Sequence, residues 1–173
     1  MTEVNIEFIG PIDSENVEKL IQTIREKVPD ACNRIHLAIQ SSGGSVPVAL
    51  ALTNVLKSLK CEIKTYNVGN VDSAAIMVFS AGTERVCSVN ATFAVHPVEK
   101  KVDGLHTVES LKLILNEIEN DTEKVAECLS QNIKGDLVSA WKKRMSHPCI
   151  INAEEAIAIG LVHKIEDYNI LFG

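Results

Sequence analysis

The sequence predicts an α/β fold with a mostly parallel sheet, and two observations carry this prediction. Strand-like and helix-like patterns alternate along the first half of the chain, an order that gives parallel strands joined by helices. Apolar residues make up 46% of the 173 residues and aromatic residues only 4%, so the core should consist of Val, Ile, Leu and Ala. No Pro-, Gly- or Ser-rich linker interrupts the chain, which predicts a single domain over residues 1–173.

The strands are predicted from short segments in which apolar and polar residues alternate with a period of two. These segments are "VNIEF", "RIHLAIQ", "EIKTYNV", "RVCSV" and "TFAVHP". The first segment places Val4, Ile6 and Phe8 on one face. Pro97 ends the last segment, because proline cannot donate a hydrogen bond to a strand ladder.

Helical spacing of apolar residues follows each of the first three strands. The first helix has Asp13 or Ser14 as its N-cap, and the second runs over about residues 45–59. The third is a short, buried helix within "GNVDSAAIMVFSAG", residues 69–82. This order of elements supports the parallel sheet.

The second half of the chain contains one long helical stripe, from about Thr107 to Lys134, which Gly135 ends. At 1.5 Å per residue this helix would be roughly 42 Å long, more than a small domain needs. Periodicity alone leaves three possibilities open, a projecting helix, an interface helix and a long core helix. The segment "INAEEAIAIGLVHKI" then predicts a short helix capped by Asn152 and a final strand.

Composition and charge exclude several classes of protein. The net charge of −6, without a cluster of Lys or Arg, argues against nucleic-acid binding. The five cysteines include no C-x-x-C pair, which is typical of core residues in a reduced, cytoplasmic protein and predicts neither disulfides nor a metal site. No apolar run is long enough to span a bilayer, and "MTEVNIEF" is unlike a signal peptide. We therefore expect a cytoplasmic protein without a cofactor.

Three polar features lie at the carboxyl ends of predicted strands, where parallel sheets hold their active sites. They are Gly43 and Gly44 in "QSSGG", Ser73 in "GNVDS", and His96. Acyl transfer needs a nucleophile, a base and N–H groups aimed at the developing oxyanion. Ser73 and His96 could supply the first two, and the diglycine loop with the N–H of Ala74 could supply the third.

Asp72 and Ser73 also have a simpler interpretation. Both residue types are good N-caps, because their oxygens accept hydrogen bonds from the first turn of a helix. From this stretch alone, capping is the more common role. Asp72 is expected to be the cap, because adjacent side chains diverge on a helix and its carboxylate is poorly placed to reach His96 beyond Ser73.

The order of motifs resembles that of the proteolytic subunit of the Clp protease, the ClpP-like family. "IQSSGGSV" looks like the family's "INSPGGSV", and "GNVDSAAIMVFSAG" resembles "GxAASxxxxxxxAG". "NATFAVHP" is similar to "NxxxMIHQP", and "NAEEAIAIGLVHKI" resembles the tail "TAEEAxxYGLID". The resemblance extends from about Ile6 to Ile165. It implies a spiral of ββα repeats, as in ClpP and crotonase, with a long protruding handle helix in a segment of about residues 100–135.

The same resemblance implies a function and an assembly. Residue by residue, Ser73 matches the nucleophile, His96 the base, and Gly44 and Ala74 the donors of the oxyanion hole. The expected activity is hydrolysis of peptides or unfolded proteins inside stacked rings of a homo-oligomer, without cofactor, metal, nucleic acid or membrane.

The chain also departs from the family pattern. The position that should hold the acid of the triad is Pro148, in "RMSHPCIIN". Ser146, Asn152 or a backbone carbonyl could hold His96 in place of the acid, and Ser42 replaces a proline of the family. The family's N-terminal segment, which forms axial pore loops, has no counterpart before the first strand, and this argues against docking of a Clp-type ATPase.

These departures leave two alternatives to a serine peptidase with an atypical triad. One is a catalytically weak or inactive structural subunit, which could partner an active paralogue, because a fold does not guarantee an activity. The other is a crotonase-type acyl-CoA enzyme, which would share the fold and the two N–H donors but would need carboxylates in the pocket.

Overall fold

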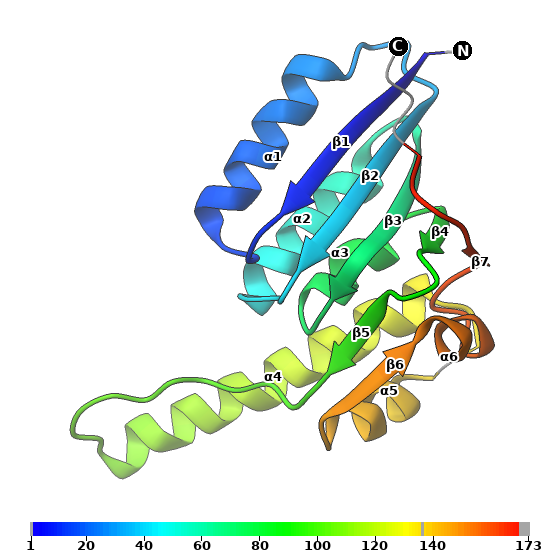
Figure 1. Cartoon of the computed structure of the whole chain (residues 1–173). Coiled ribbons are helices and arrows are strands. Elements are labelled where there is room, and N and C mark those ends of the chain that lie inside the picture. The colour runs from blue at the N-terminus through cyan, green and yellow to red at the C-terminus, as the bar shows by residue number, and fades with distance from the viewer. Residues whose placement is uncertain (1, 136, 170–173) are drawn as a thin grey trace.

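Seven strands form the centre of the molecule in the computed structural model, which describes residues 2–135 and 137–169 (Figure 1). Five of them lie side by side and are all parallel. In spatial order they are β1 (Glu3–Ile9), β2 (Arg34–Ser41), β3 (Glu62–Val71), β4 (Glu84–Cys87) and β7 (Lys164–Ile165). β5 (Thr92–Val95) pairs in parallel with β3 and antiparallel with β6 (Cys149–Asn152). The mostly parallel sheet is therefore confirmed.

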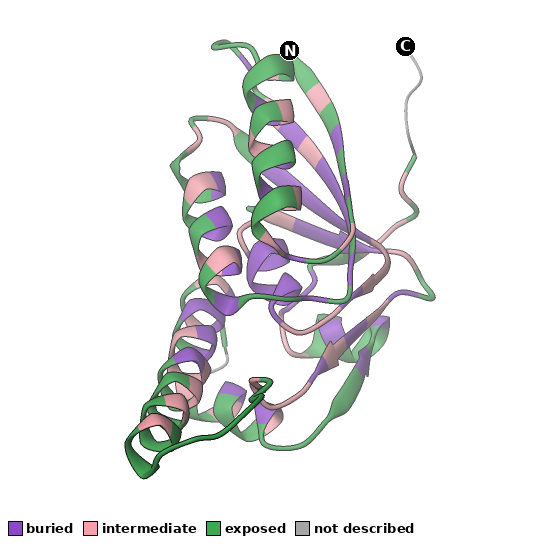
Figure 2. Ribbon diagram, turned by 90° about the vertical axis from the view of Figure 1, so that its left-hand side faces the viewer, coloured by how far each residue is buried: buried purple, intermediate pink, exposed green. Residues whose placement is uncertain are grey.

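Helices α1 (Ser14–Lys27), α2 (Val46–Ser58) and α3 (Ala75–Ser80) follow β1, β2 and β3 in the chain. All three lie on the same side of the sheet, with their buried residues turned toward it (Figure 2). The alternation in β2 explains this arrangement, because Ile35, Leu37 and Ile39 are fully buried in the core that these helices cover. A smaller cluster of Ala38, Tyr66 and Val86 forms a second group of buried residues.

The predicted N-caps of two helices are confirmed. Asp13 is the N-cap of α1, and its carboxylate accepts a hydrogen bond from the N–H of Asn16. Asn152 begins α6 (Ala153–Ala158) with a capping box, in which it and Glu155 bond each other's backbone N–H groups. These side chains satisfy N–H groups that a helix cannot pair internally.

The long helix α4 (Val108–Asn132) projects from the sheet, and the segment that leads into it runs alongside (Figure 1). Its 25 residues give a length of about 37 Å. Lys100 forms ion pairs with Glu117 and Asp121, which attach the leading segment to the helix. Only the C-terminal half of α4 is packed, with Val125 and Leu129 buried in the main core.

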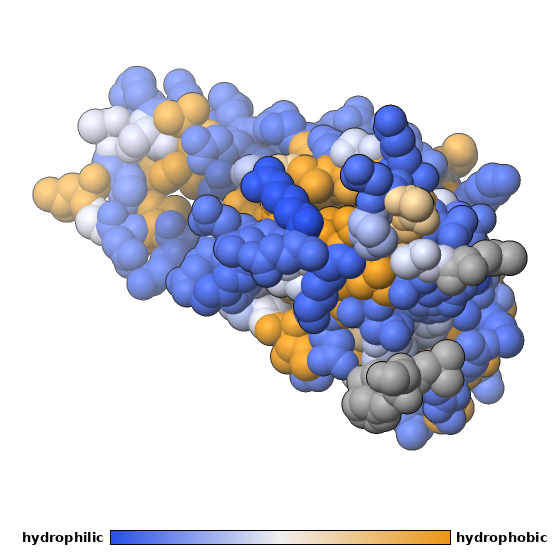
Figure 3. All heavy atoms as spheres, turned by 90° about the horizontal axis from the view of Figure 1, so that it is seen from above, coloured by the Kyte–Doolittle hydropathy of each residue, from blue (hydrophilic) through white to orange (hydrophobic). Residues whose placement is uncertain are grey.

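The projecting half of α4 exposes large apolar side chains. Orange atoms gather at this end of the molecule in Figure 3, where they lie among hydrophilic ones. The exposed large apolar residues are Leu105, in the segment that leads into the helix, and Val108, Leu111, Leu113 and Leu115 in α4 itself. Of the three possibilities left open for this helix, the structure favours a projecting one with an unpaired apolar stripe.

Two elements have no counterpart in the sequence-based predictions, α5 (Val138–Met145) and β6. In α5 only Trp141 and Met145 are buried, and two residues do not establish a helical period. In β6 only Ile151 is buried, so no alternation marks the strand. Both were missed because each buries too few side chains to leave a pattern.

Candidate active site

Ser73 lies in the sharp turn between β3 and α3, at the carboxyl end of the central strand. Its φ of 53° makes it the one non-glycine residue with a positive φ in the described part of the chain. Such a conformation costs on the order of 1–3 kcal/mol, and it persists where the surrounding structure imposes it. Here the Ser73 N–H donates to the carbonyl of Ala94 at 2.7 Å. The turn presents a half-buried hydroxyl that has no hydrogen-bond partner among the described residues.

The expectation that Asp72 or Ser73 caps α3 is wrong. The residue at the N-cap position is Ala74, and no side chain makes a capping hydrogen bond there. The Asp72 carboxylate instead accepts hydrogen bonds from the N–H of Ala94 at 2.8 Å and from Nδ2 of Asn70 at 2.6 Å. Asp72 therefore ties the turn to β5, while Ser73 is left without a capping role.

The diglycine loop lies directly against this turn. A Cβ on Gly43 would stand 2.7 Å from the Cβ of Ser73 and 2.7 Å from the carbonyl oxygen of Asp72, so only glycine fits this close approach. Gly44, with a φ of 151°, packs against the backbone of Ile12. The short distance between loop and turn brings the diglycine segment to the edge of the site.

Two N–H groups of these segments have no hydrogen-bond partner in the described part of the chain, those of Gly44 and Ala74. The neighbouring N–H of Gly43 is already used, because it donates to Oγ of Ser41 at 3.2 Å. Backbone N–H groups without partners, in segments that adjoin a serine, are suited to stabilise a negatively charged oxygen.

His96 follows β5 directly, and Nδ1 of its ring lies 2.7 Å from the carbonyl oxygen of Pro97. A carbonyl oxygen can only accept, so this contact requires that Nδ1 carries the proton. In the neutral ring Nε2 is then the nitrogen without a proton, which can accept one from a nucleophile. A backbone carbonyl thus sets the tautomer of this half-buried ring.

Ser73 and His96 line the same small pocket, which has an empty volume of about 330 Å³. Its other walls are apolar and come from α2, α3, α4, α5 and the end of β5. Val46, Ile76, Val125, Leu129 and Met145 are among them. No hydrogen bond joins the Ser73 hydroxyl to His96 among the described residues.

The antiparallel ladder of β5 and β6 shows where the missing acid would stand. Val95 pairs with Cys149, so the next pair in this register is His96 with Pro148. Neither predicted polar substitute contacts His96. Ser146 bonds the carbonyl of Lys143 and the ring of His147, and Asn152 caps α6. Of the groups considered from the sequence, the backbone carbonyl is the one that holds the imidazole.

The described residues offer few other candidates for a metal site or a reactive side chain. They contain no group of His, Cys, Asp and Glu that could hold a metal ion, and the five cysteines are free thiols. Burial raises the pKa of the Cys87 thiol to about 11, which disfavours its reactive thiolate form. Within the same residues, every helix is too short or too polar to cross a membrane.

Comparison with known proteins identifies the family. The family model described as Clp protease matches residues 1–169. The chain is 25% identical over 163 residues to ATP-dependent Clp protease proteolytic subunit 2 of Chlamydia trachomatis, covering 92% of this chain and 76% of the relative. It is 23% identical over 167 residues to the ATP-dependent Clp protease proteolytic subunit of Streptococcus pyogenes, covering 95% and 85%.

A solved structure, a ClpP1 mutant from Listeria monocytogenes, has the same fold. It superposes with a TM-score of 0.79 at 19% identity and covers 95% of this chain and 92% of its own. The fold is therefore that of ClpP, with α4 in the position of the expected handle helix. With a family model that matches nearly its whole length, the chain belongs to the Clp protease family, as a divergent ClpP-like member with a serine-protease fold.

Proposed function

We propose that this protein is a serine peptidase in which a backbone carbonyl replaces the acid of the triad. The observation that carries the proposal is that Ser73 and His96 line one pocket while the Pro97 carbonyl fixes the tautomer of the imidazole. Ser73 is the nucleophile and His96 the general base. The N–H groups of Gly44 and Ala74 form the oxyanion hole, since both lack partners among the described residues.

The proposed reaction begins when Nε2 of His96 takes the proton of the Ser73 hydroxyl as its oxygen attacks the peptide carbonyl. The negative charge that develops on the carbonyl oxygen is stabilised by the two N–H groups. His96 then gives its proton to the leaving amine, and water hydrolyses the acyl-enzyme by the same steps in reverse. The imidazolium lacks a carboxylate beside it, so we expect slow turnover.

A backbone carbonyl can replace only part of the function that a carboxylate has in a catalytic triad. Both accept the Nδ1 proton and so keep Nε2 free, but only the carboxylate carries a full negative charge to stabilise the imidazolium. In a Ser-His-Asp site, loss of that charge together with the correct tautomer costs about 10⁴ in rate. Because the Pro97 carbonyl keeps the tautomer, we expect a smaller loss and detectable hydrolysis of activated esters and small peptides.

We further propose that residues 1–173 act as one subunit domain of a homo-oligomer that encloses the active sites. The exposed apolar stripe of α4 supports this assembly, because a soluble chain gains stability when such a surface is covered. The substrates would then be peptides or unfolded chains thin enough to enter the enclosed space. The proteolytic subunits with which this chain shares its family are consistent with such substrates.

A structural subunit with little activity is the second candidate. Two observations favour it, the proline at position 148 and the lack of a hydrogen bond between Ser73 and His96 among the described residues. Catalytic hydrogen bonds often form only when substrate is bound, so the second observation is weaker than the first.

Labelling with a fluorophosphonate separates the two candidates. The probe reacts with an activated serine, so the native protein should be labelled and Ser73→Ala should not. Ser146→Ala is the matched control, because it removes an exposed hydroxyl that bonds His147 and does not contact His96. Intact assemblies without labelling, and without hydrolysis of an activated ester, would establish the structural subunit instead.

A further inference from the structure

The molecule also has a polar depression at the opposite end of α3 from Ser73. It has an empty volume of about 1070 Å³ and lies where α2, α3 and α4 end, beside the turn between α6 and β7. We call it the basic depression. Its lining includes Lys57, Arg85, Lys134 and His163, and no Asp or Glu side chain lines it among the described residues.

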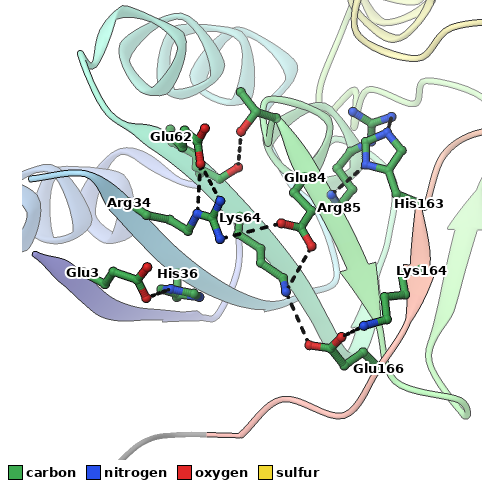
Figure 4. Close-up of polar contacts among 12 residues, drawn as sticks. Glu3, Arg34, His36, Glu62, Lys64, Glu84, Arg85, His163, Lys164 and Glu166 are labelled. Carbon is green, nitrogen blue, oxygen red and sulfur yellow. Dashed lines mark hydrogen bonds and ion pairs between the residues drawn. The ribbon is translucent and has the colours of Figure 1, made fainter. Parts of the chain in front are cut away.

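The absence of acidic residues from the part of the lining that the structure describes is notable in a chain with a net charge of −6. Three lining residues, Lys57, Arg85 and Lys134, carry permanent positive charges. The three helix C-termini that meet here offset these charges only in part, because each carries about half a negative unit charge. The carboxylate nearest in sequence, that of Glu84, pairs instead with Lys64 beside the neighbouring strand, away from Arg85 (Figure 4).

Arg85 is the most buried of these cations, with an exposed fraction of only 5%. Its guanidinium donates to the backbone carbonyls of Leu161, Gly82 and Gly160, and no carboxylate pairs with it in the described residues. Nη1 makes one hydrogen bond although it carries two hydrogens, so one donor remains available. A buried cation without an anionic partner retains a large part of its desolvation penalty.

His163 adds a second sign that an acceptor is missing. Its Nδ1 lies 3.0 Å from the N–H of Arg85, and its Nε2 lies 2.9 Å from Nη2 of the same residue (Figure 4). A neutral imidazole has one acceptor nitrogen, so one of these two contacts brings two donors together. Burial and the charges of Arg85 and Lys134 lower the pKa of His163, against the opposing charge of Glu84, and so favour the neutral ring. When the ring proton is on Nε2, the unmatched donor is Nη2 of Arg85, and an anion beside the guanidinium would accept from it.

Further donors and acceptors surround the cations. Nζ of Lys57 donates to Oδ1 of Asn132, and Nδ2 of Asn132 donates to Oγ of Ser80, so side chains of α2, α4 and α3 are joined. Lys134 is exposed and makes no ion pair among the described residues. The network holds the Lys57 ammonium group, while the exposed Lys134 lines the same depression without such a bond among the described residues.

From these observations we propose that the basic depression binds a phosphate group, as inorganic phosphate or as a small phosphate monoester. A phosphate carries up to two negative charges and several acceptor oxygens, which match three cations better than a single carboxylate does. Arg85 would hold one oxygen with its spare N–H, and the two lysines would neutralise the remaining charge. This inference is independent of the proposed peptidase activity.

Binding is tested with inorganic phosphate and with glycerol phosphate, by thermal shift and ³¹P NMR line broadening. Sodium chloride at equal ionic strength is the reference, since it screens charges without occupying the site. The test variant is Lys57→Gln with Lys134→Gln, which leaves the buried Arg85 in place. Lys27→Gln is the matched control, because Lys27 is an exposed lysine outside the depression.

We expect saturable stabilisation of the native protein and of Lys27→Gln by phosphate but not by chloride. The double variant should bind at least about tenfold more weakly. Stabilisation by glycerol phosphate as well would show that monoesters fit. Equal effects of phosphate and chloride, or unchanged binding in the double variant, would overturn the proposal. Fluorophosphonate labelling of Ser73 should be the same in all three proteins, so failure here is distinct from failure of the peptidase proposal.

Discussion

At the scale of single residues, Ser73 combines a strained backbone with a hydroxyl that bonds no described residue. The sequence predicted its place before α3 and its possible role as nucleophile, but it could not predict the positive φ. That conformation depends on the hydrogen bond to Ala94 and on the close approach of Gly43, which lie far from Ser73 in the sequence. Local propensity favours a cap here, and the tertiary contacts override it.

Replacement of Ser73 tests the strain directly. Ser73→Gly should be more stable than Ser73→Ala by about 1 kcal/mol, because glycine adopts a positive φ without a steric penalty. Both variants should lose fluorophosphonate labelling. Thermal unfolding of the two variants gives the comparison, and an alanine variant as stable as the glycine one would show that the turn is not strained.

Asp72 gives a second prediction at this scale. Asp72→Ala should destabilise the protein by about 2 kcal/mol, because the N–H of Ala94 loses a charged acceptor at 2.8 Å. Asp72→Asn is the control, since its amide oxygen can still accept that bond. Denaturant unfolding should place the Asn variant between the native protein and the Ala variant. Equal stability of all three would mean that the contact contributes nothing.

At the scale of elements, the pairing of β5 with β6 carries the most information about the site. Sequence motifs alone located Pro148 as the position of the missing acid, and the register independently places it beside His96. The contact that we propose takes the place of the acid, from the Pro97 carbonyl, could not be predicted. Every residue has a carbonyl, so side-chain identity does not reveal which one will accept the Nδ1 proton.

The same reasoning explains which elements the sequence revealed. β1, β2 and α1 each bury apolar side chains at a regular spacing, so the strand or helix period could be recognised in the sequence. β6 and α5 bury one and two side chains, and their positions follow from contacts with β5 and α4. An element whose position is determined mainly by contacts with neighbouring elements shows no clear apolar periodicity in its own sequence.

Pro148→Asp tests the register and the mechanism together. If the introduced carboxylate reaches Nδ1 of His96, it should displace the Pro97 carbonyl and raise the rate of ester hydrolysis by about tenfold or more. Pro148→Asn removes the same ring without adding a charge, so it should change the rate far less. Equal rates in both variants would mean that the charge does not act on His96.

At the scale of the whole molecule, the projecting half of α4 sets the expected behaviour in solution. Leu115→Asp places a charge within the exposed apolar stripe and should convert the proposed homo-oligomer to monomers of 18.9 kDa. Asn116→Asp adds the same charge at the next exposed position and should leave the assembly intact. Sedimentation velocity at micromolar concentration measures both, and a monomeric native protein would contradict the assembly.

The helix that carries this stripe also supplies Val125 and Leu129 to the wall of the Ser73 pocket. One rigid element therefore extends from the surface that would be shared between subunits to the place where a substrate would bind. If this helix couples the two, thermodynamic linkage requires that occupancy of the pocket and association of subunits influence each other by the same factor. Labelling per subunit should slow on dilution below the dissociation concentration, and a probe bound at Ser73 should shift that concentration. Labelling rates that stay constant through dissociation would show that the two ends of the helix act separately.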